Sequence, residues 1–197
     1  MTNAPWLRSL PALTGVAPDL DGPDLDGAYL DGAYLDTAEP ADPIRLVEGW
    51  LRHAVDAGVP EPHAVTLATV DDEGVPDART LLLKDIGERG FAVAGPRRSR
   101  KAAQLAVHPA AALSFWWQPL VRAIRIRGSV VEASPEESAA DLAARSAAAR
   151  AGVAPGDWVR WWIEPTRIEL WQGAPDRRHS RIVCTRADGA WRREDQG

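Results

Sequence analysis

The chain has 197 residues and a net charge of -5 at pH 7, with 45% hydrophobic and 26% charged residues. These totals suit one soluble domain with a proper core, and the acidic balance argues against a nucleic-acid partner held by bulk charge. The single cysteine, Cys184, cannot form an internal disulfide, which fits a reducing compartment. Without an apolar run of about 18 residues or a secretory signal, the protein is expected in the cytoplasm, with no membrane span.

The first 41 residues differ in composition from the rest. Residues 19–36 read DLDGPDLDGAYLDGAYLD, with a tandem Asp-Gly-Ala-Tyr-Leu repeat that holds both tyrosines of the chain. Such an acidic, glycine-rich segment cannot bury much apolar surface, so residues 1–41 are predicted to be a flexible extension and residues 42–197 the folded domain. An EF-hand calcium loop is rejected, because Ala33 stands where that loop needs a glutamate.

The folded part opens with a helix predicted between Asp42 and Gly58. Asp42 can act as N-cap, Pro43 suits the first turn and Gly58 supplies the stop. The apolar residues of this segment fall on one helical face: Ile44, Val47, Trp50, Leu51, Ala54 and Val55.

Two further helices are predicted among the strands. Residues 99–108 begin at Ser99, a suitable cap, and residues 134–152 begin with a Ser134/Glu137 capping box around Pro135. The alanine-rich body of the second segment is a strong helix former.

Short apolar runs separated by turn residues predict the strands. Strands at this spacing indicate an antiparallel sheet or barrel rather than βαβ units, and therefore an α+β fold. Cys184, within the run RIVCTR, is expected to be a buried strand thiol rather than a nucleophile. The expected strands cover residues 64–70, 79–84, 90–95, 111–117, 122–132, 157–173, 181–186 and 190–194.

Basic residues gather at two places before the late strands. Arg100 and Lys101 lie in the first turn of the helix that Ser99 opens, where each cation opposes the helix dipole by roughly 0.3–1 kcal/mol. A phosphate bound at that end would offset the cost, and a solvated basic turn is the alternative. Arg79 and Lys84 bracket an apolar strand, a weaker signal for an anion site.

The third basic segment is ELWQGAPDRRHSRI, residues 169–182. Arg177, His179 and Arg181 alternate, so on an extended segment they would point the same way, with Trp171 near enough to line the same cavity. Arginine binds carboxylate or phosphate through a planar fork, and histidine exchanges a proton near neutral pH. The pattern favours a pocket for an anionic, ring-shaped ligand. No HExxH or CxxC motif occurs, so no metal site is expected.

Together these segments resemble the FMN-dependent pyridoxamine 5′-phosphate oxidases, including the related phenazine-biosynthesis oxidases. The resemblance implies an antiparallel six-stranded split β-barrel with flanking helices, forming a homodimer with FMN at the subunit interface. It also implies oxidation of pyridoxamine or pyridoxine 5′-phosphate by hydride transfer to flavin N5, with O₂ as the electron acceptor and H₂O₂ as product. The matching motifs, in the family's order, are ADPIRLVEGWL, ATVDDEGVPDARTLLLKDI, RSRKAAQL, HPAAALSFWW and IELWQGAPDRRHSRI.

The resemblance also implies roles for individual residues. Lys84 and Arg145 would reach the substrate phosphate, while Arg177 and His179, the expected catalytic residues, would hold the substrate ring and amine. The FMN site implied by matching position comprises Arg79, Thr80, Leu81, Leu82, Lys84, Ala94, Gly95, Ser99, Arg100, Lys101, Trp171 and Arg181.

The chain departs from the family pattern near the substrate. Ala123 stands where the family has a flavin-contacting Gln, and Asp141 and Ala149 replace the Tyr and Ser of the phosphate pocket. The segment before Trp158 is also shortened. An aspartate beside a phosphate is repulsive by about 1 kcal/mol or more when partly buried, so we expect a diverged member of the family.

Three alternatives therefore stay open. The first is an FMN oxidase acting on another small cyclic or aromatic amine, as in the phenazine branch, which Asp141 and the shortened segment favour. The second is a flavin-binding protein without turnover. The third is a split barrel that binds a deazaflavin, which the compact basic cluster of Arg100 and Lys101 disfavours.

Overall fold

The computed structural model describes residues 42–154, 156–174 and 177–194, so the expected N-terminal extension lies outside the described residues. None of the described helices is long and apolar enough to cross a membrane. The elements in chain order are α3 (Pro43–Asp56), β1 (Ala64–Val70), β2 (Pro76–Leu82), β3 (Asp85–Gly87), β4 (Gly90–Pro96), α4 (Arg100–Val107), β5 (Ala110–Trp117), the 3₁₀ helix η1 (Gln118–Leu120), β6 (Arg122–Glu132), α5 (Pro135–Ala143), α6 (Ala147–Arg150), β7 (Trp158–Gln172), β8 (Ser180–Ala187) and β9 (Ala190–Arg193).

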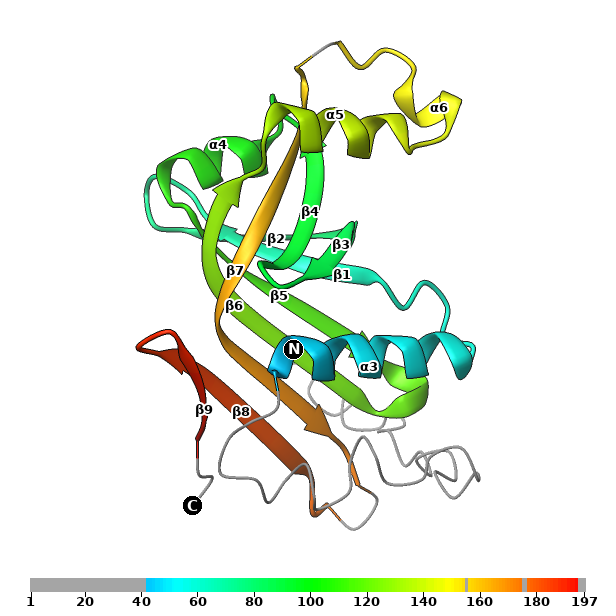
Figure 1. The fold of residues 1–197 in the computed structure, drawn as a ribbon, viewed down its shortest axis with the longest axis vertical. Coiled ribbons are helices and arrows are strands. Elements are labelled where there is room, and N and C mark those ends of the chain that lie inside the picture. The colour runs from blue at the N-terminus through cyan, green and yellow to red at the C-terminus, as the bar shows by residue number, and fades with distance from the viewer. Residues whose placement is uncertain (1–41, 155, 175–176, 195–197) are drawn as a thin grey trace, which may run out of the picture.

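All the described strands join one curled antiparallel sheet (Figure 1). Its order is β2-β1-β5-β6-β7-β4-β3, and β8 pairs with both β7 and β9. The expected α+β split barrel is confirmed, and β3, β8 and β9 extend the sheet beyond six barrel strands. β3 was not predicted because it is a three-residue strand paired only with β4.

β7 holds the two parts of the sheet together. It pairs with β6 from Trp161 to Gln172, while its first part pairs with β4 and its last part pairs with β8. Between those halves the β6–β7 register shifts at Arg127 and Gly128, which leaves Thr166 as an extra residue on β7. Such a bulge bends the strand that carries it, so β7 can serve one wall of the barrel and then the β8–β9 extension.

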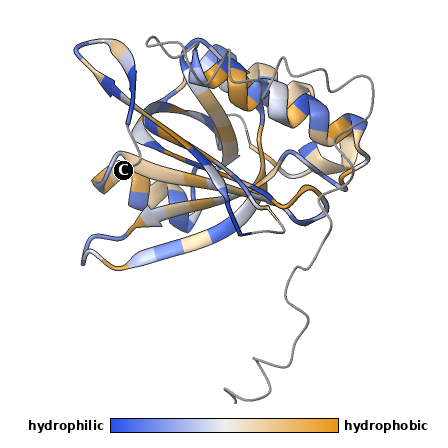
Figure 2. Ribbon diagram, turned by 90° about the horizontal axis from the view of Figure 1, so that it is seen from below, coloured by the Kyte–Doolittle hydropathy of each residue, from blue (hydrophilic) through white to orange (hydrophobic). Residues whose placement is uncertain are grey.

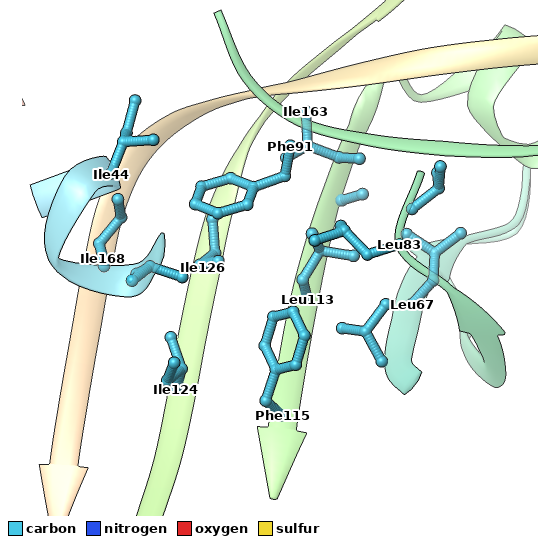
Figure 3. Close-up of a cluster of buried hydrophobic side chains, with 14 of the residues drawn as sticks. Ile44, Leu67, Leu83, Phe91, Leu113, Phe115, Ile124, Ile126, Ile163 and Ile168 are labelled. Atoms are coloured by element: carbon cyan, nitrogen blue, oxygen red, sulfur yellow. The ribbon is translucent and has the colours of Figure 1, made fainter. Parts of the chain in front are cut away.

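The core lies inside the curl of the sheet, beneath α3. Figure 3 shows Phe91, Leu113, Phe115 and Ile126 from three strands converging there with α3's Ile44. Hydrophobic and hydrophilic residues alternate along several strands (Figure 2), and β5 and β6 alternate between buried and more exposed side chains, whereas β4 is buried along nearly its whole length. This period-two pattern explains why the strands could be predicted from the sequence.

The termini of α3 agree with the predictions, but its buried face is narrower. Asp42 Oδ1 accepts a hydrogen bond from Ile44 N at 3.0 Å, and Gly58 has a φ of 70° after the last turn. Ile44, Val47, Trp50 and Ala54 are buried. The prediction for Val55 is wrong, since 58% of it is exposed. A helix resting on one side of a sheet buries only the stripe that faces it.

The helix predicted over residues 134–152 is two helices, α5 and α6. The Ser134/Glu137 capping box is present at the start of α5. The helix ends at Ala143, and Ser146 begins α6 by accepting a hydrogen bond from Ala149 N at 3.3 Å. A serine inside an alanine-rich run can bond to the backbone in this way and start a new helix.

Replacing Gly128 with alanine should destabilise the fold, because a Cβ there would collide with the Glu164 carbonyl oxygen of β7. Overpacking of this kind costs about 1–3 kcal/mol in unfolding free energy, measurable by urea denaturation. Ser129→Ala, at the exposed neighbouring position, is the matched control and should leave the midpoint nearly unchanged. Equal midpoints for the two variants would contradict the account of the bulge.

Candidate functional site

The first cluster is built around Arg79 of β2. The Arg79 guanidinium donates to Thr69 Oγ1 and, at 2.9 Å, to Gln104 Oε1 of α4. Gln104 Nε2 donates in turn to Asp77 Oδ2 at 3.3 Å. Thr69 and Gln104 are buried, with 2% and 4% of their surfaces exposed, so they fix the arginine through α4 and β1. The sequence analysis missed both, because polar residues in apolar segments carry no separate signal.

Asp77 is the acidic member of this cluster. Its Oδ2 lies 2.9 Å from Arg79 Nη2 and 3.2 Å from Arg100 Nε. The hydrogen bond from Gln104, followed by the charges of Arg79 and Arg100, lowers the pKa of Asp77. The carboxylate therefore stays ionised near neutral pH and holds the two arginines together.

Lys101 adds a third cation beside Arg79. Burial, together with the charge of Arg79, lowers the pKa of Lys101 below that of an ordinary lysine. Its ammonium lies against Gly95 of β4, where an added Cβ would collide with Nζ. Of the carboxylates in the described part of the chain, Asp77 alone forms ion pairs with this group of cations. The cluster of Arg79, Arg100 and Lys101, called the cationic cluster below, is therefore short of negative charge.

Ser99 occupies the N-cap position of α4, but its side chain makes no capping hydrogen bond. The prediction of a side-chain cap is wrong, because Lys101 Nζ donates to Ser99 Oγ at 3.2 Å instead. The first turn of a helix has free N–H groups and a partial positive charge. An uncapped first turn beside the cationic cluster has the donors and charge that bind a phosphate group.

The other residues expected in the cofactor site contribute differently. Leu81 is partly buried and packs against the core. Thr80 and Leu82 are exposed on the strand face opposite Arg79. Lys84 follows the end of β2, and its backbone N–H donates to the Ala92 carbonyl at 2.8 Å. Ala94 lies on β4, directly before the Gly95 that contacts Lys101.

The second cluster lies at the end of β7. Trp171 pairs directly with Arg181 of β8, so their side chains share one face of the sheet. The His179 ring packs against Trp171 with centroids 4.9 Å apart, and His179 Nδ1 accepts a hydrogen bond from the Ala174 N–H at 3.1 Å. A neutral imidazole in this position carries its proton on Nε2. Trp171, His179 and Arg181 are called the aromatic cluster below.

Glu169, a buried carboxylate that the sequence analysis missed, holds this cluster in place. Its oxygens lie 2.9 Å from Arg167 Nη1 and 3.4 Å from Arg181 Nε, and Arg125 donates to it as well. Burial alone raises the pKa of Glu169, but the hydrogen bonds from Arg125 and Arg167 outweigh it and the net pKa is lowered. In the sequence, the signal that could have identified Glu169 is its position as a charged residue within the apolar run IELW.

Arg177 does not share this face. Its φ is 65°, in the left-handed region, and its N–H donates to the Ala174 carbonyl at 3.0 Å. The prediction of an extended alternation through Arg177, His179 and Arg181 is therefore wrong at its first member. The chain must reverse between β7 and β8, and a residue in a turn cannot continue the strand pattern.

Arg145 belongs to a third group, between α5 and the start of β7. Its guanidinium lies 4.1 Å from the centre of the Trp158 ring, and Trp158 Nε1 donates to Asp141 Oδ2 at 2.7 Å. Asp141, which was expected to repel a phosphate, therefore accepts a hydrogen bond from the Trp158 indole, and Arg145 stacks on the same ring. Cation–π contact of this kind fixes the arginine without neutralising it.

The cationic and aromatic clusters are far apart within one protomer. Gly95 pairs with Val159 near the start of β7, whereas Trp171 pairs with Ala123 twelve residues later. At about 3.3 Å per residue, roughly 40 Å of strand separates them. In Figure 1, α4 and the end of β7 accordingly lie at opposite ends of the long axis. One mononucleotide cannot contact both clusters of a single chain.

Comparison with known proteins places the chain in a family. Residues 51–172 match the family model described as pyridoxamine 5′-phosphate oxidase, and residues 158–195 match the pyridoxine 5′-phosphate oxidase C-terminal dimerisation region. The pyridoxine/pyridoxamine 5′-phosphate oxidase of Thermosynechococcus vestitus is 40% identical, over 77% of this chain and 87% of the relative. The enzyme of the same name from Paraburkholderia phytofirmans is 37% identical, over 75% and 84%.

Solved structures agree with this placement. PhzG from Burkholderia lata 383, determined with tetrahydrophenazine-1-carboxylic acid, superposes with a TM-score of 0.74 at 27% identity, over 83% of this chain and 95% of that one. A pyridoxamine 5′-phosphate oxidase-related, FMN-binding protein from Nostoc punctiforme shares the fold, with a TM-score of 0.67 at 19% identity over 80% and 98%. In sequence and in fold, this chain belongs to the pyridoxamine 5′-phosphate oxidase family.

Proposed function

We propose that the protein is an FMN-dependent oxidase of pyridoxamine or pyridoxine 5′-phosphate that works as a homodimer. The observation that carries the proposal is the cationic cluster beside the uncapped first turn of α4. Its excess of positive charge and free N–H groups fits the compact phosphate of FMN. The similarity to pyridoxine/pyridoxamine 5′-phosphate oxidases supports the reaction.

The FMN site is proposed to need two copies of the chain. Arg79, Arg100 and Lys101 would hold the phosphate, and Trp171 with Arg181 would hold the ring. The strand length between these groups within one protomer supports their coming from different protomers. The match to the dimerisation region, residues 158–195, includes both Trp171 and Arg181.

Bound FMN would accept two electrons from the substrate and pass them to O₂, so that amine, water and O₂ become aldehyde, ammonia and H₂O₂. The protein residues orient the substrate and move protons. His179 can donate from Nε2, because its Nδ1 is occupied by the Ala174 N–H. Arg177 presents an exposed guanidinium in the turn beside it, suited to a planar anionic substrate.

A second candidate substrate is a cyclic or aromatic amine without a phosphate. PhzG, 27% identical over most of both chains, was determined with a tetrahydrophenazine carboxylic acid. Ala149 offers no hydroxyl to a phosphate, and the hydrogen bond from Trp158 to Asp141 keeps a carboxylate beside Arg145. For the leading candidate, whose substrate has a phosphate, Lys84 and Arg145 are the proposed phosphate ligands.

Anaerobic mixing separates the two candidates. FMN-loaded protein is mixed with pyridoxamine 5′-phosphate or with tetrahydrophenazine-1-carboxylic acid, and loss of the flavin absorbance is followed. Bleaching by the phosphorylated amine supports the leading proposal, and bleaching by the phenazine compound alone supports the second. Bleaching by neither compound in protein that retains FMN would indicate a flavin-binding protein without this turnover.

Removing two cations of the cationic cluster should release FMN. In the double variant Arg100→Ala/Lys101→Ala, FMN should bind at least about a hundredfold more weakly, since each of the two lost hydrogen bonds to a charged group contributes about 1.5–3 kcal/mol. Isothermal titration of the apoprotein measures the change. The control is Arg45→Ala/Arg52→Ala on exposed positions of α3, which removes the same charge elsewhere. Equal affinities for the two double variants would refute the phosphate site.

FMN affinity should also depend on pH through Lys101. Its pKa is lowered, so it loses its proton at a lower pH than an ordinary lysine, and the neutral amine cannot attract phosphate. Above pH 7, where the phosphate is already largely dianionic, affinity should therefore fall as pH rises through this lowered pKa. Lys101→Arg keeps its charge throughout that range and should abolish the fall. A decline of the same size in Lys101→Arg would assign the pH dependence to another group.

The catalytic residues should affect turnover rather than cofactor retention. His179→Ala should leave FMN bound and lower kcat roughly a hundredfold, as expected for loss of a positioned proton donor. Arg177→Ala should mainly raise KM, because it removes a charge from the substrate side. Steady-state kinetics with saturating FMN measures both. Loss of FMN from Arg177→Ala with normal turnover after FMN is added back would reverse the assignment.

A further inference from the structure

One row of side chains crosses four strands on the face that carries the aromatic cluster. Trp116 of β5 pairs with Ala123 of β6, Ala123 pairs with Trp171 of β7, and Trp171 pairs with Arg181 of β8. Directly opposed residues in antiparallel strands project from the same side of the sheet. Trp116 therefore shares a face with both residues proposed to hold the flavin ring.

Trp116 is exposed where its neighbours on β5 are buried. It is 49% exposed, whereas Phe115 and Trp117 on either side are 1% and 3% exposed and belong to the core. A large indole left half in water on a sheet face is available to a ligand, because no described element covers it.

Ala123 leaves room for the two indoles to approach each other. The ring centroids of Trp116 and Trp171 are 6.4 Å apart, at an interplanar angle of 45°. Together with the contact between Trp171 and His179, three rings follow one another along this face. A longer side chain at position 123 would stand between the indoles.

The row ends at Arg181, which has hydrogen-bonding capacity to spare. Among the residues that the structure describes, Glu169 is its ion-pair partner, with Oε1 3.4 Å from Nε. Arg181 is itself exposed and shares the sheet face of Trp171. An occupant of this surface therefore needs a flat aromatic face for the indoles and acceptors along its edge for a guanidinium, as an isoalloxazine ring has.

We infer that Trp116 is a further flavin-binding residue that contacts the isoalloxazine ring beside Trp171. The inference rests on the proposed FMN function and adds a contact that the sequence analysis did not assign. Stacking on an aromatic side chain is worth a factor of about ten or more in affinity for a planar base.

The test measures FMN binding to the full-length apoprotein, with flavin fluorescence as a second readout. Trp116→Ala should raise the Kd for FMN about tenfold and restore part of the fluorescence that a nearby indole quenches. Trp116→Phe should keep most of the affinity, because it retains an aromatic face. Val131→Ala, an exposed apolar position on β6, is the matched control and should change neither readout.

Two results would overturn the inference. The first is an unchanged Kd and unchanged fluorescence in Trp116→Ala. The second is a Kd change that disappears at protein concentrations where light scattering shows a restored dimer, which would make Trp116 a contact between protomers instead. Wild-type protein that binds no FMN would overturn the proposed function and this inference together, so the two failures are distinguishable.

Discussion

The architecture depends on β7, a single strand that must serve two parts of the sheet. It pairs with β4 at its start, with β8 at its end, and with β6 from Trp161 to Gln172. The bulge opposite Gly128 lets it bend without giving up these ladders. Because backbone hydrogen bonds fix its length and register, β7 also fixes the distance between the cationic and aromatic clusters. Under the proposed FMN function, that distance requires the two clusters of one site to come from two copies of the chain.

Carboxylates organise the cations at both places. Asp77 holds Arg79 and Arg100 beside α4, and Glu169 holds Arg125, Arg167 and Arg181 at the end of β7, where Glu194 also lies 3.7 Å from Arg167. In each group the arginines outnumber the carboxylates, which orient the guanidinium groups but do not neutralise all of them. The surplus positive charge is left for an anionic or acceptor-rich ligand, which is why both clusters suit a phosphorylated, ring-bearing cofactor.

The departures from the family pattern affect the proposed ligand-binding residues more than the fold. The Asp141 carboxylate is not isolated, because it accepts a hydrogen bond from Trp158 Nε1 and Arg145 stacks on the same indole. Ala123, where the family has a flavin-contacting Gln, lies between the exposed Trp116 and the partly buried Trp171. The same sheet can therefore present a different surface to its ligand with little change in backbone.

The sequence by itself determined the described strands other than β3 and the starts of α3, α4 and α5, since these follow from local rules of period and capping. It could not determine that Arg177 lies in a left-handed turn outside the extended segment, that Ser99 accepts from Lys101 instead of capping the helix, or that α5 ends before Ser146. Those outcomes depend on partners distant in sequence or on competition for one hydrogen bond. Tertiary structure alone decided how the basic segments are grouped, because only strand pairing brings residues far apart in the chain onto one face.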